Sequence, residues 1–460
     1  MRTRAKHVRC PLKSVASSLF NDLPDELLLQ IFTELAKVGP LYRAEEGSEH
    51  AQDMPFYSAE PHPGLRAYPF LSQVCRRWKT VLDNPAARDV LWRELVVDFG
   101  HELITAVHMP IAWSDRRPSD DEFRESFAAT RLNAARILRF VEERQKCVQR
   151  LVLMNSEGYY SDGGDFVSLT AKHNFSMAHL GMVLGMLRHS LEELQVQHCN
   201  DFFAVGSGTL SAVACLPRLR VLRIEDLHCR ADRDSLAELA QLRGLEELSI
   251  SGEENASAWG VGMDCIPSQW SALTSLRTLQ LRGHTMLSAL PSFLTALPLT
   301  HLDVSACRAA DLSVVADMTS LVTLSLQSMD LSESLASGAP APQPHAALVR
   351  RLLPPLERLT SLTALNLANN LFTRVPAALG RLSALEFLDI SGNPELQVLA
   401  PLAVLLGLPA LRVVDLRGLH EEPALGYWSE AKCTSMRYVS AFTKALRRRP
   451  YPTRVLCCST

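Results

Sequence analysis

The stretch LTALNLANN at residues 362–370 is followed by LEFLDISGN at residues 385–393, and both stretches have the same pattern of apolar residues. In each, an aliphatic residue occupies positions one, four and six, and asparagine occupies position nine. Seven further copies with aliphatic residues at these three positions begin at residues 191, 219, 245, 276, 299, 321 and 411. A segment of this kind cannot bury its apolar side alone, so successive copies must stack. The sequence therefore predicts a solenoid.

The spacing of the nine copies indicates the kind of solenoid. Their starts are separated by 28, 26, 31, 23, 22, 41, 23 and 26 residues, and a weaker tenth copy begins at Val148. Pro267, Pro291 and Pro376 recur eight or nine residues before the next copy and are expected to open a short helix or 3₁₀ turn. These features resemble the intracellular leucine-rich-repeat class. The resemblance implies an α/β fold with parallel strands on the concave face and helices or loops on the convex face.

Position nine is expected to stabilise the turn that follows each strand. Asparagine there can bond buried backbone groups, and cysteine can occupy the same space. Four copies fit this expectation, with Cys199, Cys307, Asn370 and Asn393. The other five copies depart from it, with Leu227, Glu253, His284, Met329 and Leu419.

The alternation of side chains along a strand separates buried positions from contact positions. Positions four and six point into the core, whereas three, five and seven point to the concave side. The residues at those outward positions mix both charges with amides and one aromatic ring, which favours a protein or peptide target over a lipid. The alternative is that any one of them is merely solvated. The predicted target-binding residues are Arg223, Glu225, Glu247, Gln280, Arg282, His301, Asp303, Gln327, Asn366, Phe387, Asp389, Asp415 and Arg417.

Three motifs precede the repeats, at residues 19–35, 70–82 and 91–95. The first reads LFNDLPDELLLQIFTEL, in which Pro24 suits a first helical turn and the leucines that follow form an apolar stripe. The second contains VCRRW and the third is LWREL. In this order the motifs resemble an F-box, a three-helix module, over residues 19–96. The sequence departs from the family by an insertion at about residues 37–67, where the family has a short connection.

The resemblance implies that the module docks on the Skp adaptor of a cullin-RING ubiquitin ligase. A small helical unit with surplus apolar surface is expected to bury it in the groove of a partner. The alternative is that the same residues form the core of the module itself. The positions that match the docking surface of the family are Leu23, Pro24, Leu27, Ile31, Phe32, Val74, Cys75 and Trp78.

These patterns divide the chain into five parts. We expect a basic disordered tail at 1–18, the F-box at 19–96, a helical linker at 97–147, the solenoid at 148–426, and a capping helix and tail at 427–460. A transit peptide is the other interpretation of the basic tail. The predicted function is that of a non-catalytic substrate-recognition subunit of a Skp-cullin-F-box ubiquitin ligase. The alternative is a non-catalytic leucine-rich-repeat scaffold of the cytoskeleton or the ciliary axoneme.

Composition excludes several other classes of function. A net charge of −3 gives no basic field for nucleic acid, and no apolar stretch is long enough to span a membrane. The eleven cysteines are scattered, which favours reduced thiols in the cytoplasm or nucleus. The histidines show no metal-binding or catalytic spacing, so we expect no cofactor, metal or enzymatic activity. Met177, Met182 and Met186 are expected to fill the core.

Overall fold

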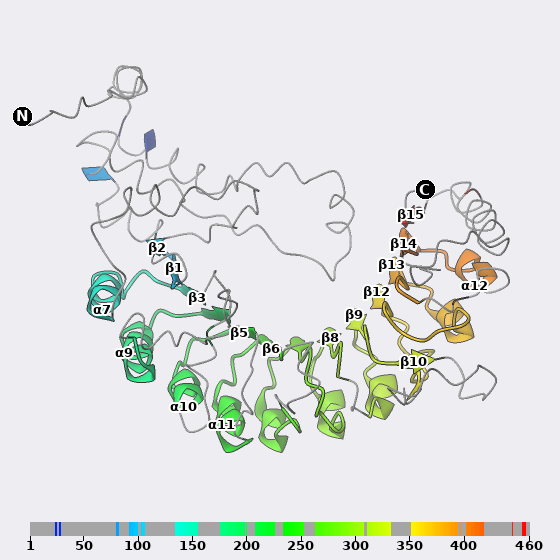
Figure 1. Ribbon diagram of the computed structural model, residues 1–460, viewed down its shortest axis with the longest axis horizontal. Helices are drawn as coiled ribbons and strands as arrows, with labels where there is room; N and C mark the ends of the chain where they lie inside the picture. Colours follow the sequence, from blue (N-terminus) through cyan, green and yellow to red (C-terminus); the bar gives the residue numbers. More distant parts are fainter. Residues whose placement is uncertain are drawn as a thin grey trace, which may run out of the picture. The chain divides into compact units, whose positions relative to one another are not determined.

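The computed structural model (Figure 1) describes the repeats and only a few residues before them. It covers residues 92–99, 103–105, 134–154, 175–197, 208–225, 233–252, 263–307, 311–332, 351–393, 402–417 and 453–456, with 24, 27, 28, 80, 81, 199, 396 and 444. The contacts divide the chain into two compact units. The described elements before Phe202 belong to the N-terminal unit, and those from Arg220 onward belong to the C-terminal unit together with residues 203–215.

The sheet of the N-terminal unit has the order β2-β1-β3-β4. Its strands are β1 (Glu94–Asp98), β2 (Leu103–Thr105), β3 (Arg150–Met154) and β4 (Glu193–Gln197). Strand β3 pairs with β1 and with β4 in parallel, whereas β2 pairs with β1 antiparallel. Helices α7 (Ala134–Glu142) and α9 (Met177–Leu187) pack against each other in this unit.

The repeat pattern begins earlier than the sequence predicted. Glu94 pairs with Arg150, which places Trp92 at position one of a repeat and Leu95 at position four. Both side chains are buried. The expectation that the third motif, at residues 91–95, is helical is therefore wrong for Glu94 and Leu95, which lie in strand β1. The sheet starts within the expected F-box and linker rather than at residue 148. The physical reason is that the run of apolar residues in β1 is buried on both faces, which favours a strand in a parallel sheet.

Helix α9 corrects the expectation for the methionines. Its buried residues are Leu180, Val183, Leu184 and Leu187, which form the side that faces the core. Met177 is 37% exposed and Met182 is 54% exposed, so these two side chains are not core filler. The helix is apolar all round, which is why the sequence alone could not tell its buried side from its exposed side.

The strands of the C-terminal unit follow one another in chain order, and each pairs in parallel with the next. The register aligns position four of every copy, so that Leu279 lies between Leu248 and Leu302. Leucines at positions one, four and six are buried, as predicted. The strands are β5 (Val221–Glu225), β6 (Glu247–Ile250), β7 (Thr278–Gln280), β8 (His301–Asp303), β9 (Thr323–Ser325), β12 (Ala364–Asn366), β13 (Phe387–Asp389), β14 (Val413–Asp415) and β15 (Arg454–Leu456).

Strand β15 was not predicted, because residues 427–460 were expected to form a capping helix and a tail. It pairs with β14 and places Val455 beside Val414 at position four. The Thr453 hydroxyl also donates a hydrogen bond to the Leu411 carbonyl, at 2.7 Å. Before β15, the described part of residues 427–460 is Lys444, which is helical.

Short helical segments lie on the side of the C-terminal unit opposite the strands (Figure 1). Pro267, Pro291 and Pro376 each directly precede a 3₁₀ helix, so the predicted role of these prolines is confirmed. The 3₁₀ helices are Leu239–Gln241, Ser268–Ala272, Ser292–Ala296, Ser313–Asp317 and Ala377–Arg381, and the α-helices are α10 (Thr209–Ala214), α11 (Arg233–Glu238) and α12 (Leu402–Leu406). The long gap between copies is bordered by a parallel pair, β10 (Leu331–Ser332) and β11 (Arg351–Leu352).

The residue at position eight turns the chain away from the sheet. Five consecutive copies have a positive φ there, at Gly283, Ala306, Ser328, Asn369 and Gly392. A non-glycine residue in this left-handed region is strained, so the neighbouring side chain must hold the turn in place. The sequence pattern did not reveal this requirement, since three of the five residues are not glycine.

Asparagine at position nine supplies that support, as predicted. The Asn370 amide oxygen accepts hydrogen bonds from the backbone N–H groups of Met329 and Leu331, both at 3.0 Å. Its amide nitrogen donates to the carbonyls of Leu326, Leu367 and Ala368. Asn393 bonds the backbone in the same way one copy later. Each asparagine therefore satisfies buried backbone groups in two adjacent copies.

His284 also occupies position nine, and its imidazole ring bonds buried backbone groups as the asparagine side chains do. Its Nδ1 accepts a hydrogen bond from the Met263 N–H at 3.2 Å, and its Nε2 donates to the Ile250 carbonyl at 2.8 Å. This arrangement requires the neutral ring. Burial lowers the pKa of His284 to about 4, although the bond to Ile250 opposes the shift.

Cys307 is the residue at position nine of the next copy, and its thiol donates to the Leu281 carbonyl. Burial raises the pKa of the Cys307 thiol to about 12.

None of the helices in the described ranges is long and apolar enough to cross a membrane.

The turn at Gly392 gives a first prediction. Alanine there would place its Cβ 1.9 Å from the Asn369 amide oxygen, at a residue whose φ is +63°. We expect Gly392→Ala to lower the free energy of unfolding by about 1–3 kcal/mol. The control is Gly244→Ala, where the added Cβ meets no atom within 4 Å and the change should be within about 0.5 kcal/mol. Urea denaturation measures both, and equal stability of the two variants would contradict the assigned strain.

His284 gives a prediction of pH dependence. The unfolded chain binds a proton near pH 6.5, whereas the folded ring binds one only near pH 4. Stability should therefore fall by about 3 kcal/mol as the pH drops from 6.5 to 4. His284→Asn keeps one donor and one acceptor and should lose less stability between pH 7.5 and 5 in urea denaturation. The control, His189→Asn, alters an exposed ring and should keep the pH dependence of the parent chain. An unchanged pH dependence in His284→Asn would rule out this assignment.

Candidate binding surface

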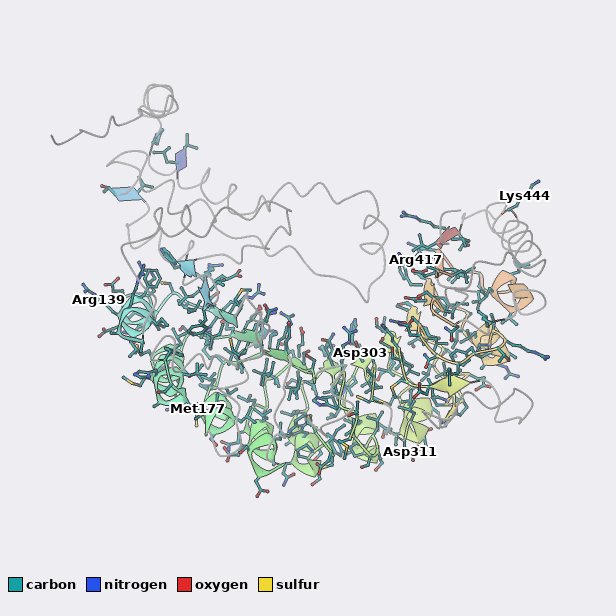
Figure 2. The ribbon with its side chains drawn as sticks, viewed as in Figure 1. Arg139, Met177, Asp303, Asp311, Arg417 and Lys444 are labelled. Atoms are coloured by element: carbon teal, nitrogen blue, oxygen red, sulfur yellow. The ribbon has the colours of Figure 1, made fainter. Side chains whose placement is uncertain are left out.

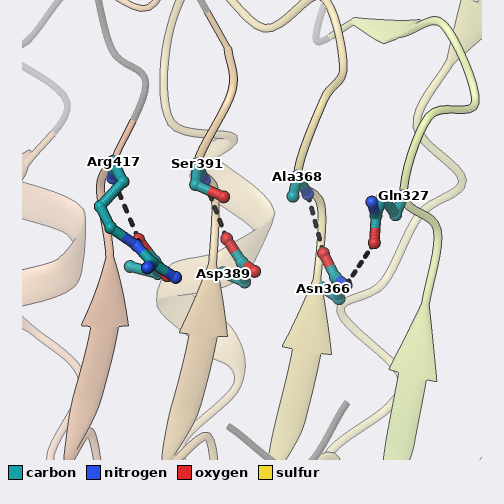
Figure 3. Close-up of polar contacts among 7 residues, drawn as sticks. Gln327, Asn366, Ala368, Asp389, Ser391 and Arg417 are labelled. Atoms are coloured by element: carbon teal, nitrogen blue, oxygen red, sulfur yellow. Dashed lines mark hydrogen bonds and ion pairs between the residues drawn. The ribbon is translucent and has the colours of Figure 1, made fainter. Parts of the chain in front are cut away.

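Position five of the repeats carries a row of carboxylate and amide side chains. In Figure 3 the Oδ1 atoms of Asn366 and Asp389 accept hydrogen bonds from the backbone N–H groups of Ala368 and Ser391. The Oδ1 atom of Asp415 accepts one from the Arg417 N–H in the same way. The distances are 2.9, 2.9 and 3.0 Å. Asp303 makes the same contact with the Ser305 N–H at 2.9 Å. A short polar side chain is favoured here because it satisfies the backbone where each strand ends.

This bonding corrects the expected target contact for three residues. Asn366, Asp389 and Asp415 are at most 1% exposed, and each is bonded within the chain. Asn366 also donates from Nδ2 to the Gln327 side chain at 3.2 Å (Figure 3). The prediction assumed that outward-facing strand positions are accessible, but these side chains are buried and bond to the backbone at the ends of their own strands. They stabilise the strand ends instead of contacting a target.

Two pairs of opposite charge lie on the strand face of the C-terminal unit. The Arg223 guanidinium makes a bidentate contact with Glu247, at 2.6 and 2.9 Å, between neighbouring strands β5 and β6. Arg282 lies 3.6 Å from Asp303, which is too long for a direct hydrogen bond. Such pairs fix the positions of the side chains and leave little net charge on the face.

Arg417 is paired within its own repeat. Its guanidinium makes several contacts with the Asp415 carboxylate, the shortest at 2.5 Å. In Figure 2, Arg417 and Asp303 lie along the strand face of the unit, whereas Asp311 lies on the opposite side. Arg417 keeps about a third of its side chain exposed, so it can still contact another molecule.

The remaining predicted contact residues are at least partly open. His301 is exposed, and Glu225, Gln280, Gln327 and Phe387 are half-buried. Desolvation lowers the pKa of His301, while the nearby Glu247 carboxylate partly opposes that shift. His301 lies between Thr278 and Thr323 in the strand register, so the ring is flanked by small polar side chains.

Phe387 lies in a different environment from His301. It packs against the buried residues Val413 and Leu456, which come from strands β14 and β15. The strand face therefore has a polar, accessible part over β5–β8 and a more closed part over β12–β15.

Sequence reasoning missed the buried serines of the strand face. Ser305, two residues beyond the end of β8, and Ser325, in β9, are buried, and their hydroxyl oxygens lie 2.8 Å apart. Ser249 is also buried, at position five of β6. Their outward strand positions were a signal that could have found them, but serine carries no charge and was passed over.

Two of the predicted adaptor-binding residues are described. Pro24 accepts a hydrogen bond from the Leu28 N–H at 3.1 Å, which closes one helical turn. Leu27 is 45% exposed, whereas Leu28 is fully buried. Leu23, Ile31, Phe32, Val74, Cys75 and Trp78 lie outside the described residues.

Among the described residues, no group of three or more histidine, cysteine, aspartate or glutamate side chains could hold a metal ion. A comparison with protein-family models gave no match, and neither did a comparison with curated proteins.

Solved leucine-rich-repeat structures show a distant likeness to the chain. Internalin C2 of Listeria monocytogenes is 23% identical over 40% of this chain and 76% of its own length, with a TM-score of 0.27. A leucine-rich-repeat protein of Leptospira interrogans is 14% identical over 69% of this chain and 85% of its own length, with a TM-score of 0.32. These scores are too low to support an argument about function. The description of the fold as a leucine-rich-repeat solenoid rests on the strand register, the 3₁₀ helices and the bonds at position nine.

The row at position five gives the third prediction. Asp389→Ala removes the acceptor for the Ser391 N–H and should lower the free energy of unfolding by about 1–3 kcal/mol. Asp389→Asn keeps that acceptor, as Asn366 does one copy earlier, and should stay within about 1 kcal/mol of the parent chain. Thermal or urea denaturation of the two variants checks this. Equal losses in both would mean that the carboxylate charge, and not the hydrogen bond, stabilises the strand end.

Proposed function

We propose that this protein is the substrate-recognition subunit of a Skp-cullin-F-box ubiquitin ligase. In this proposal the N-terminal module binds the Skp adaptor, and the strand face of the repeats binds a target protein. The chain itself is non-catalytic and requires no cofactor. Its action is to hold the target at the ligase, in the cytoplasm or the nucleus.

The observation that carries the proposal is the division between Leu27 and Leu28. They are neighbours in the helical turn that begins at Pro24, yet one is fully buried and the other is nearly half-exposed. Leu27 is flanked by Glu26 and Leu28 within the motif that resembles an F-box. An exposed leucine in a module that already has a buried one is available for a partner groove.

The target is proposed to contact the accessible part of the strand face, over β5–β8. His301 is exposed there, and the half-buried Gln280 and Arg282 lie on the neighbouring strand and just beyond its end. These side chains offer directional hydrogen bonds with little net charge, which suits a polar segment of a protein.

A second candidate is a leucine-rich-repeat scaffold without an adaptor contact, in the cytoskeleton or the ciliary axoneme. The observation that favours it is the structure of the third motif of the expected F-box, at residues 91–95. Trp92 is buried against Phe140, with ring centroids 5.2 Å apart, and the Arg144 guanidinium lies 4.5 Å from the Trp92 ring centroid. This tryptophan and Leu95 thus belong to the first repeat and are closed to a partner.

Capture of the Skp adaptor distinguishes the two candidates. The full chain, expressed with the adaptor, is expected to retain it, and Leu27→Asp should reduce the retained adaptor at least tenfold because a charge enters an apolar contact. The matched control is Leu406→Asp, which alters a helix leucine that is 42% exposed in the C-terminal unit and should retain the adaptor fully. Circular dichroism establishes that both variants fold. A folded parent chain that never retains the adaptor refutes the ligase proposal and leaves the scaffold.

A further inference from the structure

A charged triad spans the sheet of the N-terminal unit. Glu94, Arg150 and Glu193 are the first residues of β1, β3 and β4, at position three of their repeats, and the register places Arg150 between the two carboxylates. The Arg150 guanidinium lies 3.6 Å from Glu94 and 3.5 Å from Glu193, and it donates a hydrogen bond to the Gln195 side chain at 3.2 Å. Two carboxylates therefore share one guanidinium, and the triad carries one excess negative charge.

The surroundings of the triad are apolar. Val96, Val152 and Met154 lie further along β1 and β3 on the same face, and they form a buried cluster. The Glu94 and Arg150 side chains are each only 14% exposed. The Oε1 atom of Glu94 is closed to solvent and accepts no hydrogen bond. A carboxylate in such a place is unfavourable, because burial removes its hydration without supplying donors in exchange.

The burial of the Oε1 atom limits what can neutralise Glu94. A lysine or arginine of a partner would have to reach an oxygen that solvent does not reach, whereas a proton can arrive by brief local opening. In the described part of the chain, the charged groups that act on Glu94 are Arg150 from β3 and Glu193 from β4. Strand β2 adds no titratable side chain. The pKa of Glu94 is raised to about 6 by burial, with attraction to Arg150 lowering it and repulsion from Glu193 raising it further.

We propose that Glu94, Arg150 and Glu193 form a proton-linked element, in which protonation of Glu94 between pH 7.5 and 5 stabilises the sheet of the N-terminal unit. The sign follows from linkage. A carboxyl that binds its proton more tightly in the folded state contributes stability that is fully present below its unfolded pKa of 4.5. That contribution is lost as the pH rises through about 6. The proposal is independent of the ligase assignment.

The test compares hydrogen exchange in the full chain at pH 7.5 and pH 5. Glu94→Gln mimics the protonated carboxyl without changing its shape. At pH 7.5 we expect amides in residues 92–99 and 150–154 to exchange on the order of tenfold more slowly in this variant than in the parent chain. At pH 5 the two proteins should differ by less than about twofold, because the parent chain is then protonated too.

Two further variants make the result decisive. Glu193→Gln leaves one carboxylate for one guanidinium. The difference in amide exchange between pH 7.5 and pH 5 in residues 92–99 and 150–154 should therefore be smaller than in the parent chain. Glu192→Gln is the matched control, because that side chain pairs with Arg218 and not with Arg150, and it should keep the response of the parent chain. The proposal is overturned if Glu94→Gln exchanges as fast as the parent chain or faster at pH 7.5. It is also overturned if Glu193→Gln shows the same difference in exchange between the two pH values as the parent chain. This second criterion applies even if Glu94→Gln does not fold.

Discussion

The backbone at the end of each strand must find hydrogen-bond partners inside a stack that excludes water. Five consecutive copies turn sharply at position eight, where φ is positive even for Ala306 and Ser328. The N–H and C=O groups freed by that turn are buried, which favours a side chain with both a donor and an acceptor. Asn370, Asn393 and His284 meet this need with different chemistry but the same pattern of bonds. Each of the three side chains also bonds the preceding copy, at Leu326, Leu367 and Ile250, so these bonds support the stacking of the leucines.

The backbone also needs hydrogen-bond acceptors at position five, and this changes the interpretation of the strand face. A polar residue on the outward side of a strand suggests a ligand contact, yet Asp389 and Asp415 are used by the backbone of their own repeats. Polarity was therefore a poor guide to accessibility on this face. Exposure is the better guide, and it favours the part around His301 over the part around Phe387.

Two buried titratable groups respond to acid in opposite directions. Protonation of His284 opposes folding of the C-terminal unit, because the neutral ring is what the turn requires. Protonation of Glu94 favours the N-terminal unit, because it removes a charge that lacks donors. Both effects come from burial, which always disfavours the charged form, whether that form carries the proton or has lost it.

The sequence by itself determined the repeat, because leucines at positions one, four and six can be buried together only by stacking. It also predicted the role of the asparagines and the 3₁₀ helices after Pro267, Pro291 and Pro376. The asparagine amide carries both a donor and an acceptor, and proline fixes φ at the start of a helical turn. Only the tertiary structure decided that Trp92 begins a repeat and that Arg454–Leu456 is a strand of the sheet, because neighbouring strands supply the hydrogen bonds that make these short segments extended. It alone separated bonded from accessible side chains on the strand face. That distinction depends on atoms from adjacent copies, which no local pattern contains.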